Sequence, residues 1–486
     1  MKKILLLICL LYSLSTIAQS ITANTGIGNW DAPGTWVGGN VPGPSNNIII
    51  PSSAKVKVNA TGLSISHITI TGTGQLEINN PFTINGGAAS SNGGTIAIKD
   101  DLTVTQEDFT NTGSIAVTKG KKFVFSSNAT TLTNSNGSIT LNSDSDEFSS
   151  LVFAGTYVDN SGSGDRITYS RFISGISTTG VNNWNIVGSP VSGEIADHIT
   201  AQSNLATNGS GASLVYGFGT YDNTTGANGT WSTFNSDGSF TEDLLESGKG
   251  YQMVSVGTGA TIAFSGKLVT SDVTFATSVG DNAGEAASAT GTRWNLLANP
   301  YTSFISINSN ASSASSNGSD YLIKTANSNL MHDNNTGIFV FNGSSYKTVN
   351  SSTSAANAVL APGEGFMFGA KHSNTGDFTF TIEMRTDDGT ADTFAGDAMD
   401  PDRSELFIAL SKNESNYSTE LYFLENGTDG LDYSYDSGTM GIFNNPIYSR
   451  LLSDDNGVDM SIQTLNFDEI NDKVIPLGIH AEAGEE

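Results

Sequence analysis

The sequence contains a single cysteine, Cys9, which lies inside an apolar run close to the N-terminus. Two lysines precede this run, and small residues ending at Ala18 form a cleavage site for signal peptidase. The run itself is too short to span a membrane. The sequence therefore predicts a signal peptide over residues 1–18 and a mature chain that starts at Gln19. This secreted chain would have no thiol, disulfide, thiolate-bound metal or transmembrane segment.

Charged residues are also scarce, at 14% of the chain, and the basic ones are especially few. There are 21 Lys and Arg against 48 Asp and Glu, so the net charge is −27, and loss of the two N-terminal lysines makes it −29. A surface this negative repels nucleic acid and anionic membranes, and neither is expected as a partner. Half of the Asp and Glu residues, 24 of 48, lie beyond residue 376. The C-terminal quarter is therefore much more acidic than the rest of the chain.

Helical periodicity is missing from the mature chain. Glycine is abundant, at 54 residues, and short runs of Ile, Val and Phe alternate with Ser, Thr and Asn. This pattern is typical of β-strands separated by tight turns, and it predicts an all-β protein. Because disulfides are absent, buried apolar area and backbone ladders must stabilise the chain, whose length allows several cores.

A pattern of glycine followed by alternating apolar residues recurs at Gly74, Gly94, Gly113 and Gly137, with spacings of 20, 19 and 24 residues. A period near 20 predicts a short parallel β-helix, placed at residues 19–156. The apolar residues of the pattern should point inward, namely Leu76, Ile78, Ile96, Ile98, Ile115, Val117, Ile139 and Leu141. Three asparagines precede strands, where a residue that tolerates the left-handed conformation is useful and where stacked amides can bond to one another. They are Asn92, Asn111 and Asn136.

The first mature residues form a distinct phrase, NWDAPGTWVGGNVPGPSNNIII, over residues 29–50. Its prolines and glycines exclude a regular strand. We expect Trp30 and Trp36 to fold over the open end of the solenoid as a cap on its apolar core. The alternative is that both indoles are exposed and stack on sugar rings.

The middle of the chain is a duplication. The motif WNIVGSP, which starts at Trp184, recurs 110 residues later in the similar form WNLLANP. The motif SGKGYQM likewise recurs as PGEGFMF. These echoes predict two β-sandwich-like units, residues 157–280 and 281–386, or one pseudo-twofold unit built from both. Lys249 is exchanged for Glu364 between matched glycines, so we expect structural glycines around an exposed charged residue.

Both copies carry aromatic residues on their strands. Two interpretations remain open: the rings form the core of the sheets, or they form a platform that binds a glycan. The residues concerned are Tyr216, Phe218, Tyr221, Trp231, Phe339, Phe341 and Tyr346.

Beyond the duplication we expect an acidic linker over residues 387–404 and a C-terminal β region over residues 405–486. Its strands should include residues 406–410, 420–424 and 474–479. Acidic loops provide ingredients for calcium binding without the EF-hand spacing, and the alternative is a solvated surface. The stronger cluster is Asp454, Asp455, Asn456, Gly457 and Asp459, and the weaker one is Asp397, Asp400 and Asp402. No other cofactor is indicated.

No catalytic constellation stands out. The histidines are scattered and lack metal-ligand spacing: His67, His198, His332, His372 and His480. Some β-helix proteins cleave polysaccharides with acidic groups on an exposed face, and paired carboxylates can cleave glycosidic bonds. Acids that lie close together in this solenoid are Asp100, Asp101, Glu107 and Asp108. A non-enzymatic protein is the favoured prediction, and a polysaccharide-degrading enzyme is the minor alternative.

Four further motifs lie near the C-terminus, namely YSYDSGTMG, IYSRLL, IQTLNFDEI and VIPLGI. Together with the N-terminal segment and its coils and with the duplicated WN units, they resemble the large secreted surface proteins of Bacteroidota that leave the cell by type IX secretion. The resemblance implies an exported, adhesin-like protein at the outer cell surface that contacts surface glycans or proteins. Such proteins continue after a phrase like VIPLGI into a sorting region, whereas this chain ends in AEAGEE, which indicates a truncated or atypical signal.

Overall fold

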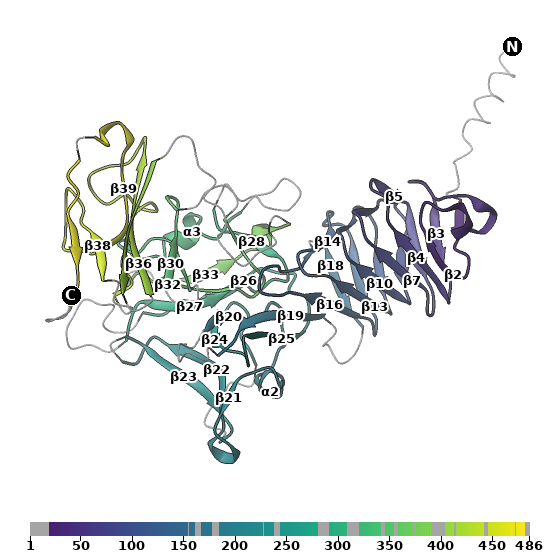
Figure 1. The fold of residues 1–486 in the computed structure, drawn as a ribbon, viewed down its shortest axis with the longest axis horizontal. Coiled ribbons are helices and arrows are strands. Elements are labelled where there is room, and N and C mark those ends of the chain that lie inside the picture. Colours follow the sequence, from purple (N-terminus) through teal and green to yellow (C-terminus); the bar gives the residue numbers. More distant parts are fainter. Residues whose placement is uncertain are drawn as a thin grey trace, which may run out of the picture. The chain divides into compact units, whose positions relative to one another are not determined.

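The computed structural model is all-β, with 49% of residues in strands and 6% in helices (Figure 1). It divides into two compact units, Met1–Thr140 with Phe153–Arg166, and Leu141–Val152 with Ile167–Glu486. The predicted signal peptide and most of the predicted linker lie outside the described residues. The structure describes residues 19–153, 155–160, 167–176, 184–226, 228–237, 244–279, 291–308, 320–341, 346–353, 358–372, 376–387, 389, 404–412, 415–441, 446–471 and 473–481.

The first unit is the predicted parallel β-solenoid, with about six turns. One parallel sheet contains β1 (Ser20–Thr22), β3 (Asn47–Ile50), β6 (His67–Ile70), β9 (Ser90–Asn92), β12 (Phe109–Asn111), β15 (Thr131–Asn134) and β18 (Thr156–Asp159). A second contains β2 (Gly26–Asn29), β4 (Ala54–Val58), β7 (Gln75–Ile78), β10 (Thr95–Ile98), β13 (Ser114–Val117) and β16 (Ser138–Asn142). A third contains β5 (Leu63–Ile65), β8 (Phe82–Ile84), β11 (Leu102–Val104) and β14 (Lys122–Phe125).

The register places like side chains above one another in the solenoid core. Ile96 pairs with Leu76 on one side and with Ile115 on the other, so the aliphatic residues form columns through the coils. All eight residues predicted to point inward are buried. The prediction is therefore confirmed, because a repeat near 20 residues returns the same face of the strand to the core.

A buried amide ladder runs beside this core. The Nδ2 of Asn92 donates to Oδ1 of Asn111 (2.8 Å), and the Nδ2 of Asn111 donates to Oδ1 of Asn134 (2.9 Å). Asn136 was predicted as the third member of this ladder, and that part of the prediction was wrong. Asn136 occupies the following turn with a φ of 61°, which confirms the prediction of a left-handed position that asparagine tolerates better than most residues.

The N-terminal phrase closes the solenoid as a cap. Trp30 and Trp36 are fully buried with their ring centroids 5.0 Å apart, and Trp30 also packs on Phe82 (5.1 Å). The indole N–H of Trp36 donates to the carbonyl of Trp30 (2.7 Å). Because these rings face the core, they form a cap and offer no platform for a sugar.

The second unit contains two copies of one strand arrangement. In the first copy the sheet runs β20 (Asn185–Val187), β24 (Tyr251–Met253), β22 (Val215–Asp222), and β22 also pairs β23 (Thr230–Asn235) and β21 (Thr207–Asn208). In the second the order is β27 (Trp294–Ala298), β32 (Gly365–Gly369), β29 (Ile338–Phe341), β30 (Tyr346–Val349). Each copy adds an antiparallel pair, β19 (Ile167–Ser174) with β25 (Gly259–Gly266), and β26 (Val273–Ala276) with β33 (Asp377–Phe380). Short helices occupy corresponding places, α2 (Ala196–Thr200) and α3 (Thr325–Ser328).

The two copies are interlocked by reciprocal contacts. Val187 of the first echo forms a bridge with Glu364, and Lys249 forms the matching bridge with Leu297 of the second echo. Equivalent hydrogen bonds accompany them: the N–H of Gly188 donates to the carbonyl of Gly363, and that of Ala298 to Gly248, each at 2.9 Å. Each copy thus completes the other, which favours the single pseudo-twofold unit over two separate ones.

Lys249 and Glu364, the charged residues between the paired glycines, were predicted to be exposed, and the structure corrects this prediction. Glu364 is only 5% exposed, and its Oε2 accepts a hydrogen bond from the N–H of Ala361 (2.9 Å). Lys249 is half-buried. The expectation of an exposed position was wrong because both residues lie where the strands of the opposite copy pass.

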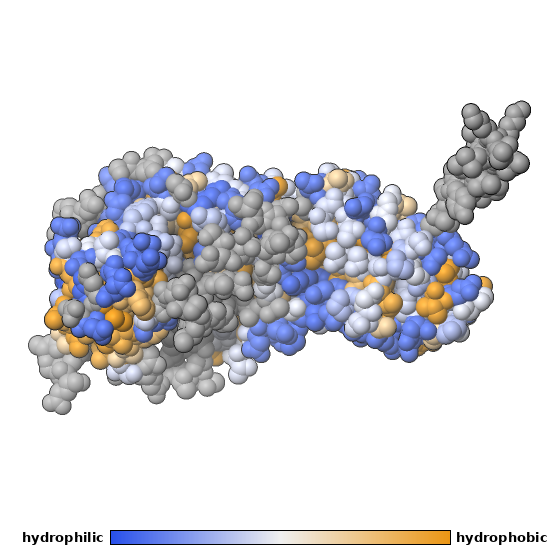
Figure 2. Space-filling view, turned by 90° about the horizontal axis from the view of Figure 1, so that it is seen from above, coloured by the Kyte–Doolittle hydropathy of each residue, from blue (hydrophilic) through white to orange (hydrophobic). Residues whose placement is uncertain are grey.

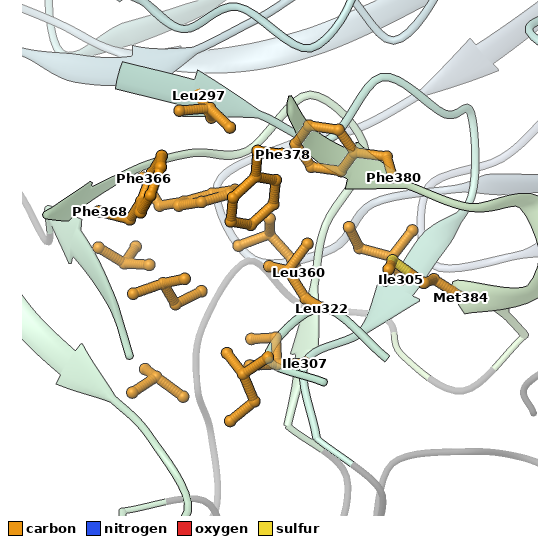
Figure 3. Close-up of a cluster of buried hydrophobic side chains, with 14 of the residues drawn as sticks. Leu297, Ile305, Ile307, Leu322, Leu360, Phe366, Phe368, Phe378, Phe380 and Met384 are labelled. Atoms are coloured by element: carbon orange, nitrogen blue, oxygen red, sulfur yellow. The ribbon is translucent and has the colours of Figure 1, made fainter. Parts of the chain in front are cut away.

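A large hydrophobic core of the second unit lies in the second copy (Figure 3). Leu297, Phe366, Phe378 and Phe380 point toward one another, with Leu360 beneath them. The remaining sheet near this core has the order β31 (Val359–Leu360), β28 (Phe304–Ser306), β34 (Arg385–Thr386).

A C-terminal sheet completes the second unit. Its order is β35 (Ser404–Lys412), β36 (Ser415–Leu424), β39 (Met460–Asn466), β38 (Ile447–Ser449), β40 (Leu477–Ile479), and β37 (Ser437–Gly438) pairs β39. The three predicted strands are present, except that the last begins at Leu477 instead of Val474.

Polar contacts join this sheet to the second copy. Thr336 Oγ1 donates to the carbonyl of Asp436 (2.6 Å), and Asn350 Nδ2 donates to that of Tyr435 (2.9 Å). The buried carboxylate of Asp436 accepts from the N–H of Thr464 (2.6 Å) and from that of Asp432 (2.7 Å). Burial raises the pKa of Asp436 to about 7.

Candidate functional site

Aromatic residues of both copies meet in one cluster, which we call the aromatic cluster. Tyr221 on β22 lies 4.8 Å from Trp231 on β23, and Phe341 on β29 lies 5.0 Å from Tyr346 on β30. The cluster gathers there because β22–β23 and β29–β30 occupy equivalent places in the two copies. Its buried members are Ile186, Tyr221, Trp294, Leu296, Phe339, Met367 and Met440, and its partly exposed members are Trp231, Phe341 and Tyr346.

The hydroxyl groups of the aromatic cluster face inward. Burial raises the pKa of Tyr346, and the nearby hydroxyl of Tyr221 raises it further. Burial likewise raises the pKa of Tyr221, whose hydroxyl donates to the carbonyl of Asn228 (3.0 Å). Trp231, Phe341 and Tyr346 are the partly exposed members of the cluster, and aromatic side chains of this kind can stack against an apolar or sugar face.

The aromatic residues predicted to act together divide into two groups. Phe218 lies outside the aromatic cluster, since it stacks on Phe234 (4.1 Å) and packs against Tyr251 (5.5 Å) in the interior of the first copy. Tyr216 is half-buried and belongs to neither group. Sequence reasoning missed Trp294 as a cluster member, although its place at the start of the second echo, 4.9 Å from Phe339, could have indicated it.

Three of the four acids predicted to lie close together in the solenoid bind the neighbouring coil. Asp100 pairs with Lys121 (3.0 Å), and Asp101 accepts from the N–H of Lys122 (3.0 Å). Asp108 accepts from the N–H of Thr131 (2.6 Å). These bonds run from one coil to the next, so the acids hold adjacent turns together.

Glu107 occupies a different position, because its side chain is turned into the solenoid. One of its carboxylate oxygens accepts a hydrogen bond from the Ser90 hydroxyl, and the other is buried without a hydrogen-bond partner. Burial, and to a lesser extent the nearby charge of Asp108, raise the pKa of Glu107 to about 8. A catalytic acid must reach its substrate, and a carboxyl group in this position reaches only its own core.

In the stronger of the two predicted calcium clusters, two of the acids lie beside the positively charged side chain of Arg450. Arg450 pairs with Asp459 (2.7 Å) and lies 3.7 Å from Asp455, and Asp459 also contacts Nε2 of His480 (2.6 Å). In the part of the chain that the structure describes, no group of three or more His, Cys, Asp or Glu side chains could hold a metal ion. The weaker cluster, Asp397, Asp400 and Asp402, lies outside the described residues.

The histidines take separate local roles. His198 contacts the buried Glu194 (2.8 Å), and His332 accepts from the N–H of Asn334 (3.3 Å). Burial lowers the pKa of His67, while His372 is exposed. Their positions on different elements agree with the scattered spacing in the sequence.

These observations define the class as an all-β chain in which a capped parallel β-solenoid precedes an interlocked duplication and a C-terminal sheet. The chain belongs to the family described as a domain of unknown function, DUF8693, whose model matches residues 127–486. The match includes the last coils of the solenoid and the whole second unit. No curated protein and no solved structure matches the chain. Among the described helices, none is long and apolar enough to cross a membrane.

Proposed function

We propose that this protein is an exported, non-enzymatic interaction component, adhesin-like in character, that acts outside the cell or at its outer surface. The observation that carries the proposal is that the clustered acids of the solenoid are engaged in contacts within the solenoid itself. Asp100, Asp101 and Asp108 tie coils together, and Glu107 is turned inward. The solenoid then serves as a spacer, and the interlocked duplication serves as the presenting module.

The chemical consequences of this proposal can be tested with polysaccharides. Purified protein incubated with acidic and neutral polysaccharides should release neither reducing ends nor unsaturated products. A glycosidase or lyase of known activity provides the positive control. Sustained release that is lost in an Asp100→Asn and Asp101→Asn double variant would overturn the non-enzymatic proposal and support the polysaccharide-degrading alternative.

A second candidate function is glycan binding at the aromatic cluster. Trp231, Phe341 and Tyr346 favour it, because they are the members of the aromatic cluster that are only partly buried. Sugar rings stack on aromatic faces by their apolar C–H surface, and each immobilised ring adds to the affinity.

A glycan array with the mature protein, read with calcium and again with chelator, tests this candidate. If the aromatic cluster binds, Trp231→Ala should reduce the signal for a defined sugar class by about tenfold or more. Tyr216→Ala, which removes a half-buried ring outside the cluster, is the matched control and should leave the signal within about twofold. Silence of the unmodified protein on the array, in both conditions, would end the glycan hypothesis.

A further inference from the structure

Exposed apolar side chains concentrate in the C-terminal region, on its sheet and on the loops between its strands. Among the described residues, sixteen large apolar side chains are exposed, and nine of them lie between residues 404 and 481. Figure 2 shows apolar colour gathered at the left-hand end, where Figure 1 places β36, β38 and β39. The nine are Leu406, Phe407, Tyr433, Tyr435, Phe467, Ile470, Val474, Leu477 and Ile479.

Strand β35 is the longest apolar edge of this sheet. It stands at the end of the strand order, with β36 beside it, and pairs with β36 over nine residues. Leu406 is 48% exposed and Phe407, on the opposite face, is 47% exposed. A long apolar edge strand is a template for another strand, and soluble proteins usually protect such edges with lysine, proline or a bulge.

The two faces of β35 differ in chemistry. Register with β36 places Leu406 beside Leu421, and Ile408 packs against the same small core. On the other face Phe407 lies opposite Glu420 and 6.1 Å from Tyr422. One face is therefore aliphatic, and the other combines an aromatic ring with carboxylates.

The charge on this side of the strand is negative. Glu405 lies opposite Tyr422, so it shares the face of Phe407 with Glu420. Residues 404–481 contain 13 Asp and Glu against 3 Lys and Arg. An incoming strand would gain from positive charge on that face, and like-charged side chains directly opposite one another would be unfavourable.

We propose that the β35 edge binds an extended segment of a partner protein that is aliphatic on one face and carries lysine or arginine on the other. The segment adds to the sheet as a strand, its aliphatic face continuing the row of Leu406 and Ile408 and its basic face meeting Glu405 on β35. A second copy of this chain fits less well, because it would bring the same carboxylates and a net charge of −27 to the contact. The inference names the kind of partner and rests on the proposed role as an interaction component.

The test uses the mature protein and labelled nine-residue peptides of alternating valine and lysine, read by fluorescence anisotropy. A valine–glutamate peptide and a valine–lysine peptide interrupted by proline are the peptide controls. Phe407→Lys and Leu406→Lys place a positive charge on the edge. Val474→Lys is the matched control, because Val474 is 86% exposed, outside the strands, and receives the same charge. Far-UV circular dichroism and melting temperature verify the fold of each variant.

We expect the valine–lysine peptide to bind, with an affinity that falls as salt is added. The Phe407→Lys and Leu406→Lys variants should weaken it by about tenfold or more, and Val474→Lys by less than about twofold. Glu405→Gln should reduce the preference for lysine over glutamate. Failure of the unmodified protein to bind the lysine peptide, or equal binding of the glutamate or proline peptide, would overturn the proposal. Dimerisation that Phe407→Lys abolishes would overturn it too, by assigning the edge to a second copy.

These outcomes are separable from those of the proposed function. Polysaccharide turnover would contradict the non-enzymatic role without affecting peptide binding at β35. Conversely, loss of peptide binding would leave the glycan-array result for Trp231 unchanged.

Discussion

The glycine pairs in SGKGYQM and PGEGFMF lie where the two copies cross, and their backbone geometry explains why this motif is repeated. The first glycine of each pair adopts a positive φ, +87° at Gly248 and +66° at Gly363. The second has no room for a side chain: a Cβ at Gly250 would lie 2.7 Å from Cγ of Leu296, and one at Gly365 would lie 2.8 Å from the carbonyl carbon of Ile186. The same two demands, left-handed backbone and close approach, therefore recur in both copies.

Replacing Gly365 by alanine should destabilise the second unit by about 2 kcal/mol or more, because the added methyl group overlaps the Ile186 backbone. Urea unfolding followed by circular dichroism measures the change. Gly441→Ala is the control, since nothing lies within 4 Å of its added Cβ, and it should stay within about 0.5 kcal/mol. Equal effects of the two substitutions would show that the crossing is not tightly packed.

Residues preceding the two prolines show how different amino acids meet one local need. Ser189 Oγ accepts a hydrogen bond from the N–H of Val191 (3.3 Å), and Asn299 Oδ1 accepts one from the N–H of Tyr301 (3.0 Å). Each side chain bonds the backbone two residues on, as Ser and Asn commonly do in turns. The exchange of serine for asparagine between the echoes therefore preserves the turn.

Glu107 should make the stability of the solenoid depend on pH. Its pKa is about 8 in the folded protein against about 4.5 when unfolded, so the folded state favours the protonated form. The stabilising contribution is complete below pH 4.5 and is lost as the pH rises through 8. Melting temperatures from pH 5 to 9 should therefore fall less for Glu107→Gln, which stays neutral, than for the unmodified protein. An identical pH profile for both proteins would contradict the inward, neutral placement of Glu107.

Individual elements were predictable from the sequence where their contacts are local or periodic. The solenoid touches only neighbouring coils, so a repeat near 20 residues predicts which side chains enter the core, as Ile96 and Ile115 illustrate. The cap was predictable because Trp30 and Trp36 are large apolar rings next to an open end. Asn134 was missed, because its place in the ladder depends on the longer loop before β16 and not on the average period.

Loss of the cap should expose the first coil of the solenoid. Trp30→Ala removes a buried ring that contacts Trp36 and Phe82, so it should cost about 3–5 kcal/mol. Ile27→Ala is the control, because Ile27 lies on β2 just before Trp30 and is 73% exposed, so its loss should change stability little. Hydrogen exchange should show loss of protection over the first coils in Trp30→Ala alone. Protection as strong as in the unmodified protein would argue against a capping role.

Candidate sites depend on contacts that the sequence does not specify. The acids at Asp455 and Asp459 suggested calcium, but Arg450, whose side chain reaches both, could be assigned only from coordinates. Likewise, the aromatic cluster joins Tyr221 to residues more than 100 positions away, and no local pattern indicates which rings stay partly exposed. Long-range pairing and side-chain direction are what the sequence left undetermined.

At the scale of the whole molecule, the interlock makes the duplication one folding unit. Neither copy alone can form the reciprocal bridges of Val187 with Glu364 and of Lys249 with Leu297. Residues 167–272 expressed alone should lack a cooperative melting transition, whereas coexpression with residues 273–386 should restore it. A cooperative transition in the isolated first copy would contradict the interlocked account and favour two separate units.

Export to the outer surface is the central claim, and treatment of intact cells of a Bacteroidota host with protease tests it most directly. The account predicts that the full-length chain is digested while a cytoplasmic marker stays intact. It also predicts that mass spectrometry of the undigested protein finds Gln19 as the first residue. Complete protection of the chain in intact cells, together with a retained N-terminal segment, would contradict the account.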